Sequence, residues 1–317
     1  MASEGSSFAK GMLFGSLVCL VFSIFAGLRN DSSSGKGNHF HHHVKAASKE
    51  ELMRMPESMK QQLSQQVRVY CLIMVQPKVL VHWAATRDTW SKHCDKAMFY
   101  TSEASKALEA VDLQEKNEWA QIRKALQDAF RNASNLHWFF IARATTFAII
   151  ENLKYLLLGK DPNEPFYIGN VLKSGDLDYV EYNSGVVLSY EAVRRLMEAF
   201  KDEYKCPQNG NALWNLKEEK ELAVCLRFCG VYAENGEDSE GNGLFNSKSV
   251  YDLISEGMKE RSSNVVKSCC SDLAITFSGM SPSEMQVMMF GVYRLRPYGH
   301  SFQDSLVFLP PKGSDND

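Results

Sequence analysis

The hydrophobic pattern of the chain changes from one long uncharged run near the N-terminus to a polar stretch, and then to alternating strand and helix signals. The strand signals are short and almost continuously apolar, which is typical of a parallel sheet buried on both faces. The pattern predicts strands at 67–75, 96–101, 138–142, 166–169 and 185–188. It predicts helices at 81–90, 118–131, 191–200, 218–229 and 285–293, and an apolar helical pattern at 146–159. Strands alternating with helices indicate an α/β domain with a mostly parallel sheet.

Two helix starts carry capping signals. Ser189 precedes the helix at 191–200 and is a candidate N-cap. The last helix begins with Ser281-Pro282-Ser283-Glu284, which combines a capping box with a proline at the first helical position. These signals fix where the two helices are expected to begin.

The uncharged run covers residues 11–28 and is bounded by Lys10 and Arg29. At ~1.5 Å per residue its length is about 27 Å, just enough for the hydrocarbon core of a bilayer. It exceeds the roughly 7–15 residues of a signal-peptide core, and no A-x-A pattern follows it. We expect a signal-anchor helix at 11–28, a cytoplasmic tail at 1–10, a lumenal stem at 29–66 and a lumenal domain at 67–317. This is the topology of a single-pass type II membrane protein.

The amino-acid composition argues against nucleic acid as a partner. The chain has 317 residues, 35 Lys and Arg, 38 Asp and Glu, and a net charge of −3. Such a chain has no basic surplus with which to neutralise a nucleic-acid backbone. We therefore expect no nucleic-acid partner, and contact with a membrane only through the anchor.

Cysteines and sequons favour an oxidising compartment. Seven of the eight cysteines follow the anchor, and Asn30 and Asn132 begin Asn-x-Ser sequons. Asn132 is the candidate N-glycosylation site, since Asn30 lies close to the expected membrane. An odd number of thiols leaves one cysteine free or linking two chains of a homo-oligomer. The disulfide candidates are Cys71, Cys94, Cys206, Cys225, Cys269 and Cys270, and the unpaired candidate is Cys229; a zinc site at Cys225 and Cys229 is the weaker alternative.

Several stretches between residues 67 and 300 resemble the inverting β-1,3-glycosyltransferases of the secretory pathway, most closely the core 1 galactosyltransferase branch. They include Cys71-Leu-Ile-Met-Val-Gln-Pro, Thr89-Trp90 with Cys94, Trp138-Phe-Phe, Glu151-Asn-Leu-Lys-Tyr-Leu-Leu, Asp161-Pro162 with Pro165, Cys269-Cys-Ser-Asp272 and Tyr293-Arg-Leu-Arg-Pro-Tyr-Gly299. The resemblance implies a GT-A-like, Rossmann-related glycosyltransferase fold. The resemblance also extends through the stem, the segment Lys173-Ser-Gly-Asp-Leu and the C-terminal tail. In these parts the chain resembles a chaperone of the core 1 galactosyltransferase.

Enzymes of this family hold a divalent cation through an Asp-x-Asp or Asp-Asp-Asp motif that follows a strand like the one at 138–142, where the ion neutralises the leaving diphosphate. The matching positions here are Arg143, Ala144 and Thr145. Because they contain no carboxylate, we expect no bound metal, no cofactor and no catalytic residue. A lone Asp-x-Asp at Asp176 and Asp178 is interpreted as part of a turn.

The sequence therefore favours an inactive, glycosyltransferase-like chaperone in the endoplasmic reticulum membrane, with core 1 β-1,3-galactosyltransferase as its client and a role in mucin-type O-glycan synthesis. Its candidate client-contact strand comprises Val69, Tyr70, Leu72, Ile73, Met74 and Val75. One alternative is a diverged lumenal binding protein without chaperone activity. Another is a metal-independent transferase with Glu221 or Asp272 as base, although a solvated helix surface is the simpler interpretation of Glu221. Retained nucleotide binding near Arg294, Arg296, Tyr298 and His300 is left open.

Overall fold

A computed structural model describes residues 65–76, 80–103, 109–133, 135–210, 216–259 and 270–295. The chain divides into two units, 1–43 and 44–317, and all described residues belong to the second. The expected tail, the anchor at 11–28 and nearly all of the stem lie outside the described residues. Within the described ranges, no helix has the length and apolar character needed to cross a bilayer.

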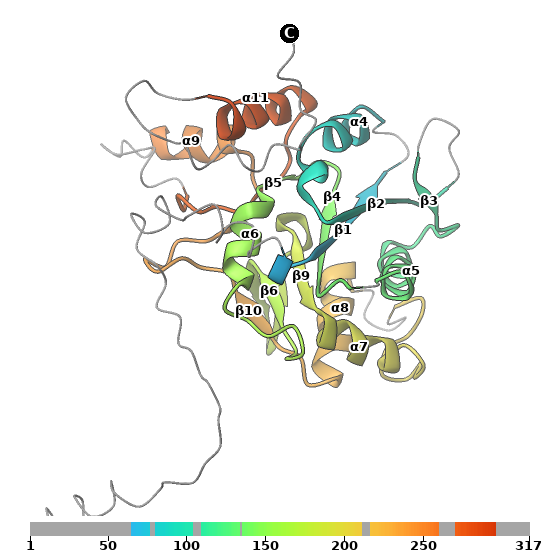
Figure 1. Ribbon diagram of the computed structural model, residues 1–317. Coiled ribbons are helices and arrows are strands. Elements are labelled where there is room, and N and C mark those ends of the chain that lie inside the picture. The colour runs from blue at the N-terminus through green and yellow to red at the C-terminus, as the bar shows by residue number, and fades with distance from the viewer. Residues whose placement is uncertain are drawn as a thin grey trace, which may run out of the picture. The chain divides into compact units, whose positions relative to one another are not determined.

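A seven-stranded mixed sheet forms the centre of the domain (Figure 1). β9 runs antiparallel to its neighbours β4 and β6, whereas the other pairings in the sheet are parallel. The predicted α/β domain with a mostly parallel sheet is confirmed. The spatial order is β10 (Ala233–Asn235), β6 (Tyr167–Gly169), β9 (Val186–Ser189), β4 (Trp138–Arg143), β1 (Val69–Val75), β2 (Lys96–Thr101) and β3 (Val111–Asp112).

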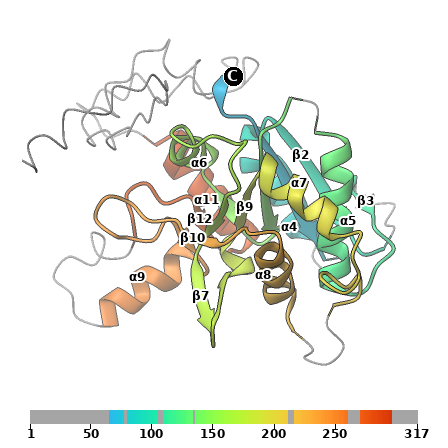
Figure 2. The ribbon, with the colours of Figure 1, turned by 90° about the horizontal axis from the view of Figure 1, so that it is seen from below.

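Helices cover both faces of this sheet and create two hydrophobic cores. Along β1, Tyr70, Leu72 and Met74 belong to one core, and Cys71 and Ile73 belong to the other. Alternate side chains of a strand point to opposite faces, so an apolar strand supplies both cores. In Figure 2, α6 and α11 of the second core lie to the left of α5, α7 and α8 of the first core. The first core contains α5 (Glu118–Arg131), α7 (Tyr190–Ala199) and α8 (Glu218–Phe228); the second contains α4 (Leu80–Asp88), α6 (Ile150–Leu157) and α11 (Pro282–Tyr293).

The predicted capping signals are confirmed. The Ser189 side chain accepts a hydrogen bond from the Ala192 amide at the start of α7. Ser281 and Glu284 form both hydrogen bonds of a capping box at the start of α11. These bonds satisfy amides that the first turn of a helix cannot pair internally.

Smaller elements complete the described fold. The helical pattern expected at 146–159 is only partly right, because residues 147–148 form strand β5, which pairs with β12 across the domain. Short extended segments of this kind depend on distant partners, so local periodicity does not reveal them. These elements are β5 (Phe147–Ala148), β11 (Phe245–Asn246) and β12 (Thr276–Phe277) in a second sheet, the hairpin β7 (Val171–Ser174) and β8 (Leu177–Val180), helix α9 (Val250–Lys259), and the 3₁₀ turns η1 (Trp90–His93) and η2 (Tyr182–Ser184).

Strand β1 is unsuitable as the client-contact strand proposed from sequence. It lies between β4 and β2 and pairs with both, and all seven of its residues are buried, among them the candidates Val69, Tyr70, Leu72, Ile73, Met74 and Val75. A strand adds to a sheet only at an unpaired edge. The folded domain offers no such edge at β1, and we do not retain this strand as a contact surface.

In each core, a disulfide joins two separate parts of the chain. Cys71 of β1 is bonded to Cys94, which follows η1, and Cys206 is bonded to Cys225 of α8. Cys270 is also disulfide-bonded, while Cys269 lies outside the described residues. Cys229 is a free, half-buried thiol at the end of α8. Because Cys225 is oxidised, it is not available with Cys229 for a zinc site.

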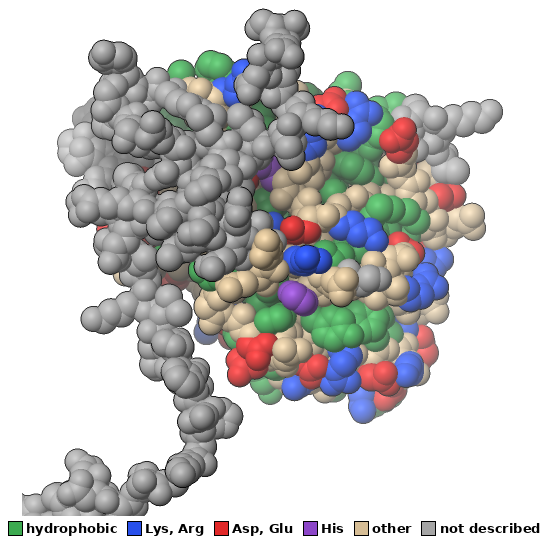
Figure 3. All heavy atoms as spheres, in the orientation of Figure 1, with side chains coloured by type: hydrophobic (Ala, Val, Ile, Leu, Met, Phe, Trp, Pro, Cys, Tyr) green, Lys and Arg blue, Asp and Glu red, His purple; other side chains and the backbone are tan. Residues whose placement is uncertain are grey.

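The surface mixes charges of both signs. On the face visible in Figure 3, basic and acidic side chains alternate over the described part of the chain. Ion pairs between exposed residues, such as Lys201 with Glu198 and Lys248 with Glu256, contribute to this mixture. Such a pattern is typical of a solvated surface.

A partly buried polar cluster attaches α11 to the second core. The Glu151 carboxylate at the start of α6 lies 2.6 Å from Nδ1 of His93 and accepts a hydrogen bond of 2.7 Å from the hydroxyl of Tyr293. The His93 and Tyr293 rings stack with their centroids 4.3 Å apart. Burial alone raises the pKa of Glu151, but the contacts with His93 and Tyr293 outweigh it and lower that pKa. The cluster therefore stabilises the charged carboxylate.

Substituting Tyr293→Phe should lower the free energy of unfolding by about 1–3 kcal/mol at pH 7, because it leaves a buried carboxylate with one donor fewer. Tyr251→Phe is the matched control, since Tyr251 is exposed; its effect should stay within about 0.5 kcal/mol. Chemical denaturation measures both. Since the folded pKa of Glu151 is lowered, its contribution is present above the unfolded pKa and is lost as the pH falls through the folded pKa. Equal stability of both variants at pH 7 would contradict the assignment.

Candidate functional site

The candidate site lies where the carboxyl end of β4 meets the N-terminal turns of α5 and α8. Arg143 is the last residue of β4, and Glu118 and Glu218 are the first residues of the two helices. Ligand sites of open α/β sheets form outside the carboxyl ends of the strands. Arg143 is one of the three residues at which the resemblance described above places the family's metal motif, so the site lies where that resemblance predicts family chemistry.

Arg143 is held between two carboxylates. Its Nη2 atom donates hydrogen bonds of 2.8 Å to Oε2 of Glu118 and 2.8 Å to Oε1 of Glu218. The guanidinium carbon lies 4.7 Å from the centroid of the Tyr182 ring, in a cation–π arrangement. The Arg143 side chain is 20% exposed. Although burial lowers the pKa of Arg143, Tyr182 and the two carboxylates reverse this and raise it. The guanidinium therefore stays charged.

The other two motif positions, Ala144 and Thr145, form backbone hydrogen bonds with residues of the two hydrophobic cores. Ala144 is buried, and its amide donates to the carbonyl of Met74. The carbonyl of Thr145 accepts a hydrogen bond from the amide of Met280. These positions offer a methyl group, a hydroxyl and a guanidinium in place of carboxylates. This donor set does not fit a divalent cation, which takes carboxylate oxygens. No cluster of three or more His, Cys, Asp or Glu side chains able to hold a metal occurs in the described ranges.

The two glutamates beside Arg143 affect each other's ionisation. Burial, followed by a hydrogen bond with Glu118, raises the pKa of Glu218. Burial also acts to raise the pKa of Glu118, but the hydrogen bonds from Arg143 and Glu218 lower it overall. One guanidinium cannot neutralise two close carboxylates, so the pair tends to share a proton.

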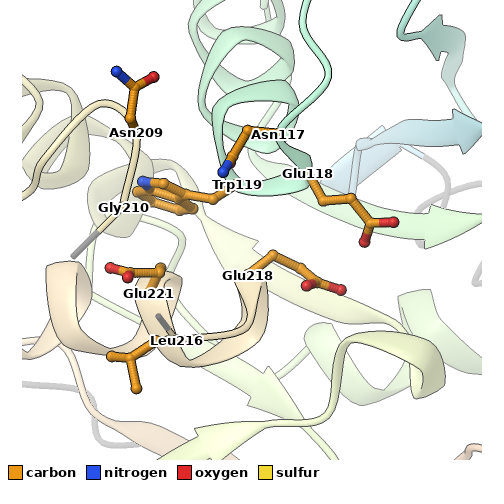
Figure 4. A pocket seen from close by; sticks show the side chains of 8 residues that line it. All are labelled: Asn117, Glu118, Trp119, Asn209, Gly210, Leu216, Glu218 and Glu221. Carbon is orange, nitrogen blue, oxygen red and sulfur yellow. The ribbon is translucent and has the colours of Figure 1, made fainter. Parts of the chain in front are cut away.

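A cavity of about 240 Å³ opens beside this cluster (Figure 4). Glu118 and Glu218 extend to one side of it, and Glu221 lies on the other. Gly210 has φ = 81°, and a Cβ there would lie 3.1 Å from Oε1 of Glu221. The pocket is therefore acidic and closely packed at Gly210. Its lining residues are Asn117, Glu118, Trp119, Asn209, Gly210, Leu216, Glu218 and Glu221.

Glu221 is not on a solvated helix surface, and that sequence interpretation was wrong. Its residue is only 2% exposed. The neighbouring Lys220 instead turns away, and its Nζ donates to Ser174 Oγ and lies over the Tyr179 ring. Adjacent residues of a helix point about 100° apart, so a loose alignment of two charges does not reveal which one faces the core.

The remaining predicted chemical residues do not line this pocket. Asp176 and Asp178 lie at the tip of the β7–β8 hairpin, where Gly175 has φ = 63°, and the turn interpretation is confirmed. Asp272 is exposed, and Arg294 is exposed at the end of α11. Arg296, Tyr298 and His300 lie outside the described residues.

Sequence reasoning missed Glu118, Glu218 and Tyr182. An acidic residue in the first turn of a helix is ordinary, because it interacts favourably with the helix dipole. The two glutamates are also 100 positions apart in the sequence, so their spacing carries no signal. Only the topology brings them to the same guanidinium.

Sequence comparison assigns the chain to a protein family. The chain is 30% identical over 296 residues to glycoprotein-N-acetylgalactosamine 3-beta-galactosyltransferase 1 of Xenopus laevis, an alignment covering 83% of this chain and 75% of that protein. It is also 30% identical over 154 residues to a beta-1,3-glucosyltransferase of Mus musculus, covering 46% of this chain and 30% of the relative. The chain belongs to the β-1,3-glycosyltransferase family. No protein-family model matches it.

Solved glycosyltransferases are distant structural neighbours. A glycosyltransferase involved in glycosylation of the major capsid of PBCV-1 has a TM-score of 0.41 and 16% identity, and the match covers 70% of this chain and 98% of that one. The glycosyltransferase GlyE of Streptococcus pneumoniae TIGR4 has a TM-score of 0.33 and 12% identity, with coverage of 68% and 55%. The family assignment rests on the sequence relative from Xenopus laevis.

Replacing either glutamate with glutamine should change stability in opposite directions. Because its folded pKa is raised, Glu218 stabilises the fold below its unfolded pKa, and this stabilisation is lost as the pH rises through the folded value. Glu218→Gln should therefore unfold at higher denaturant concentration than the wild type at pH 8, and the difference should shrink toward pH 4.

Glu118 should show the reverse dependence, because its folded pKa is lowered. Its stabilisation is present above the unfolded pKa and is lost as the pH falls through the folded pKa. Glu118→Gln should destabilise the protein at pH 8 by no more than about 1 kcal/mol, since a side chain that is 45% exposed is screened by solvent. Denaturation curves from pH 4 to 8 test both variants; the same sign of change for both at pH 8 would refute the shared-proton arrangement.

Proposed function

We propose that this chain is a glycosyltransferase-like protein without transferase activity that assists the folding of core 1 β-1,3-galactosyltransferase. In this role it would resemble Cosmc, the dedicated chaperone of that enzyme, and would support mucin-type O-glycan synthesis. The observation that carries the proposal is Arg143, a cation fixed between Glu118 and Glu218 at the place of the family's metal motif.

The charge at this place argues against metal-assisted transfer. A divalent ion near Arg143 would be repelled by the guanidinium, and the two nearest carboxylates already bind that guanidinium. Removing Arg143 would leave the partly buried carboxylate of Glu218 without its cation, which is unfavourable. These side chains support the proposed inactivity.

Extended sequence resemblance supports the choice of client. The resemblance to Cosmc runs through the stem, the segment Phe147-Ala-Ile-Ile-Glu-Asn-Leu-Lys-Tyr and the tail from Leu306 to Asp317. We accordingly propose a type II protein of the endoplasmic reticulum membrane, anchored at 11–28, with residues 67–317 in the lumen.

Expression of this chain in cells lacking Cosmc should restore core 1 galactosyltransferase activity in the lysate. Authentic Cosmc is the positive control and empty vector is the negative control. If authentic Cosmc restores activity while this chain, expressed to the same level, does not, the chaperone proposal fails and a diverged lumenal binding protein replaces it.

The purified chain should not transfer sugar from UDP-galactose to an O-linked N-acetylgalactosamine acceptor, with Mn²⁺ or with EDTA. Turnover in EDTA that Glu221→Gln abolishes would instead establish a metal-independent transferase, since Glu221 would then supply the base.

Asn132 should carry an N-glycan. It is exposed at the C-terminal end of α5, and its Nδ2 donates hydrogen bonds to the backbone carbonyl and to Oδ1 of Asp128. Treatment with an N-glycosidase should increase the electrophoretic mobility of the wild type and of Asn30→Gln, but not of Asn132→Gln. If the domain were digested by protease in intact microsomes, the lumenal orientation would be wrong.

A further inference from the structure

Exposed apolar side chains concentrate on one layer of the domain. Of the twelve large hydrophobic residues that are exposed in the described part of the chain, eight lie on α4, α9 and α11 or directly after α11. Figure 1 shows these three helices along the top of the domain. Isolated exposed hydrophobic residues are normal, whereas a concentration on one side marks a contact surface. The eight are Leu80, Val81, Tyr251, Met258, Val287, Phe290, Val292 and Leu295.

Helix α11 is apolar on opposite sides. Met285 is buried, and Met288, Met289 and Tyr293 pack against the second core, as the methionines were expected to do. The other side carries Val287 and Phe290, which are 69% and 57% exposed, and Leu295, which follows the helix, is 63% exposed. We call these three residues the outer face of α11. A helix at a solvated surface normally carries polar residues there, and a helix that is hydrophobic all round is normally covered on both sides.

Helix α4 extends this apolar surface. It packs against α11, and the Thr86 hydroxyl lies 3.8 Å from the sulfur of Met285. At its N-terminal end, Leu80 and Val81 are 40% and 64% exposed. The surface is thus shared by two helices held in fixed relation, and it is rigid enough to accept a complementary segment.

The chain itself supplies such a segment. The described residues end at Leu295, on the outer face of α11, and the chain continues for 22 residues. That tail contains one run of four large apolar residues at 306–309, Leu-Val-Phe-Leu, and ends in polar Gly-Ser-Asp-Asn-Asp. Leu306 lies eleven positions after Leu295, a reach of up to roughly 36 Å, whereas a 12-residue helix is only about 18 Å long.

We propose that residues 306–309 dock on the outer face of α11. Attachment at Leu295 holds this segment near the face at an effective concentration on the order of millimolar, so a modest intrinsic affinity suffices. Burying Leu306 and Phe308 against Val287 and Phe290 removes apolar surface of both partners from water. Docking of residues 306–309 also prevents the exposed apolar side chains of α11 from associating with other molecules. This inference does not depend on the chaperone proposal.

The test uses the full-length chain with Leu306→Ser and Phe308→Ser together. Hydrogen exchange of the α11 amides should become about ten-fold faster, equivalent to about 1.4 kcal/mol, and binding of a hydrophobic dye should increase. The matched control, Asp315→Ser with Asp317→Ser, alters the same tail without touching the apolar run and should change neither signal.

The reciprocal variant, Val287→Ser with Phe290→Ser, should make the tail more sensitive to protease while near-ultraviolet circular dichroism stays native. Unchanged exchange and dye binding in the tail variant would overturn the proposal. Sedimentation then identifies the occupant: concentration-dependent dimerisation that the helix variant abolishes would assign the face to a second copy, and monomers would leave it open to another protein.

Discussion

The contact between Arg143 and the glutamates Glu118 and Glu218 is the constraint on which the functional side of the domain depends. It joins the end of a central strand to the first turns of two helices that lie far apart in sequence. Helix N-termini attract negative charge, so each glutamate is favourable in its own helix, but together they need a cation. The guanidinium supplies it, and Tyr182 stacks against the cation. Pocket shape, carboxyl ionisation and helix placement follow from this contact.

The opposite side of the sheet is fixed differently. There, Glu151, His93 and Tyr293 form a partly buried cluster, and Cys71 is bonded to Cys94. Both sides share β1 and β4, whose alternate side chains enter the two cores. Because α11 is attached through its inner side, its outer face is free to evolve without loss of the core.

Local signals predicted the main elements well, and contacts between distant residues limited the rest. The strand at 96–101 and the helix at 118–131 have the expected bounds, since β-branched and aromatic runs and amphipathic spacing act within a few residues. Strand β5 was missed because it exists through pairing with β12. The candidate site was likewise predicted only in part. Arg143 was identified from its position directly after a predicted strand, but Glu118 and Glu218 approach it only because of the topology of the sheet.

Membership of the β-1,3-glycosyltransferase family does not by itself establish transferase activity, because a fold can be kept while the residues of its active site change. A metal-dependent site holds carboxylates that repel one another until the ion binds, so ligand and stability are linked. Arg143 provides a permanent cation, although with one charge against two carboxylates, and burial together with the neighbouring Glu118 raises the pKa of Glu218. This contact between side chains needs no ion. Such independence would suit the proposed chaperone role, in which the protein would stay folded while its client does not yet bind substrate.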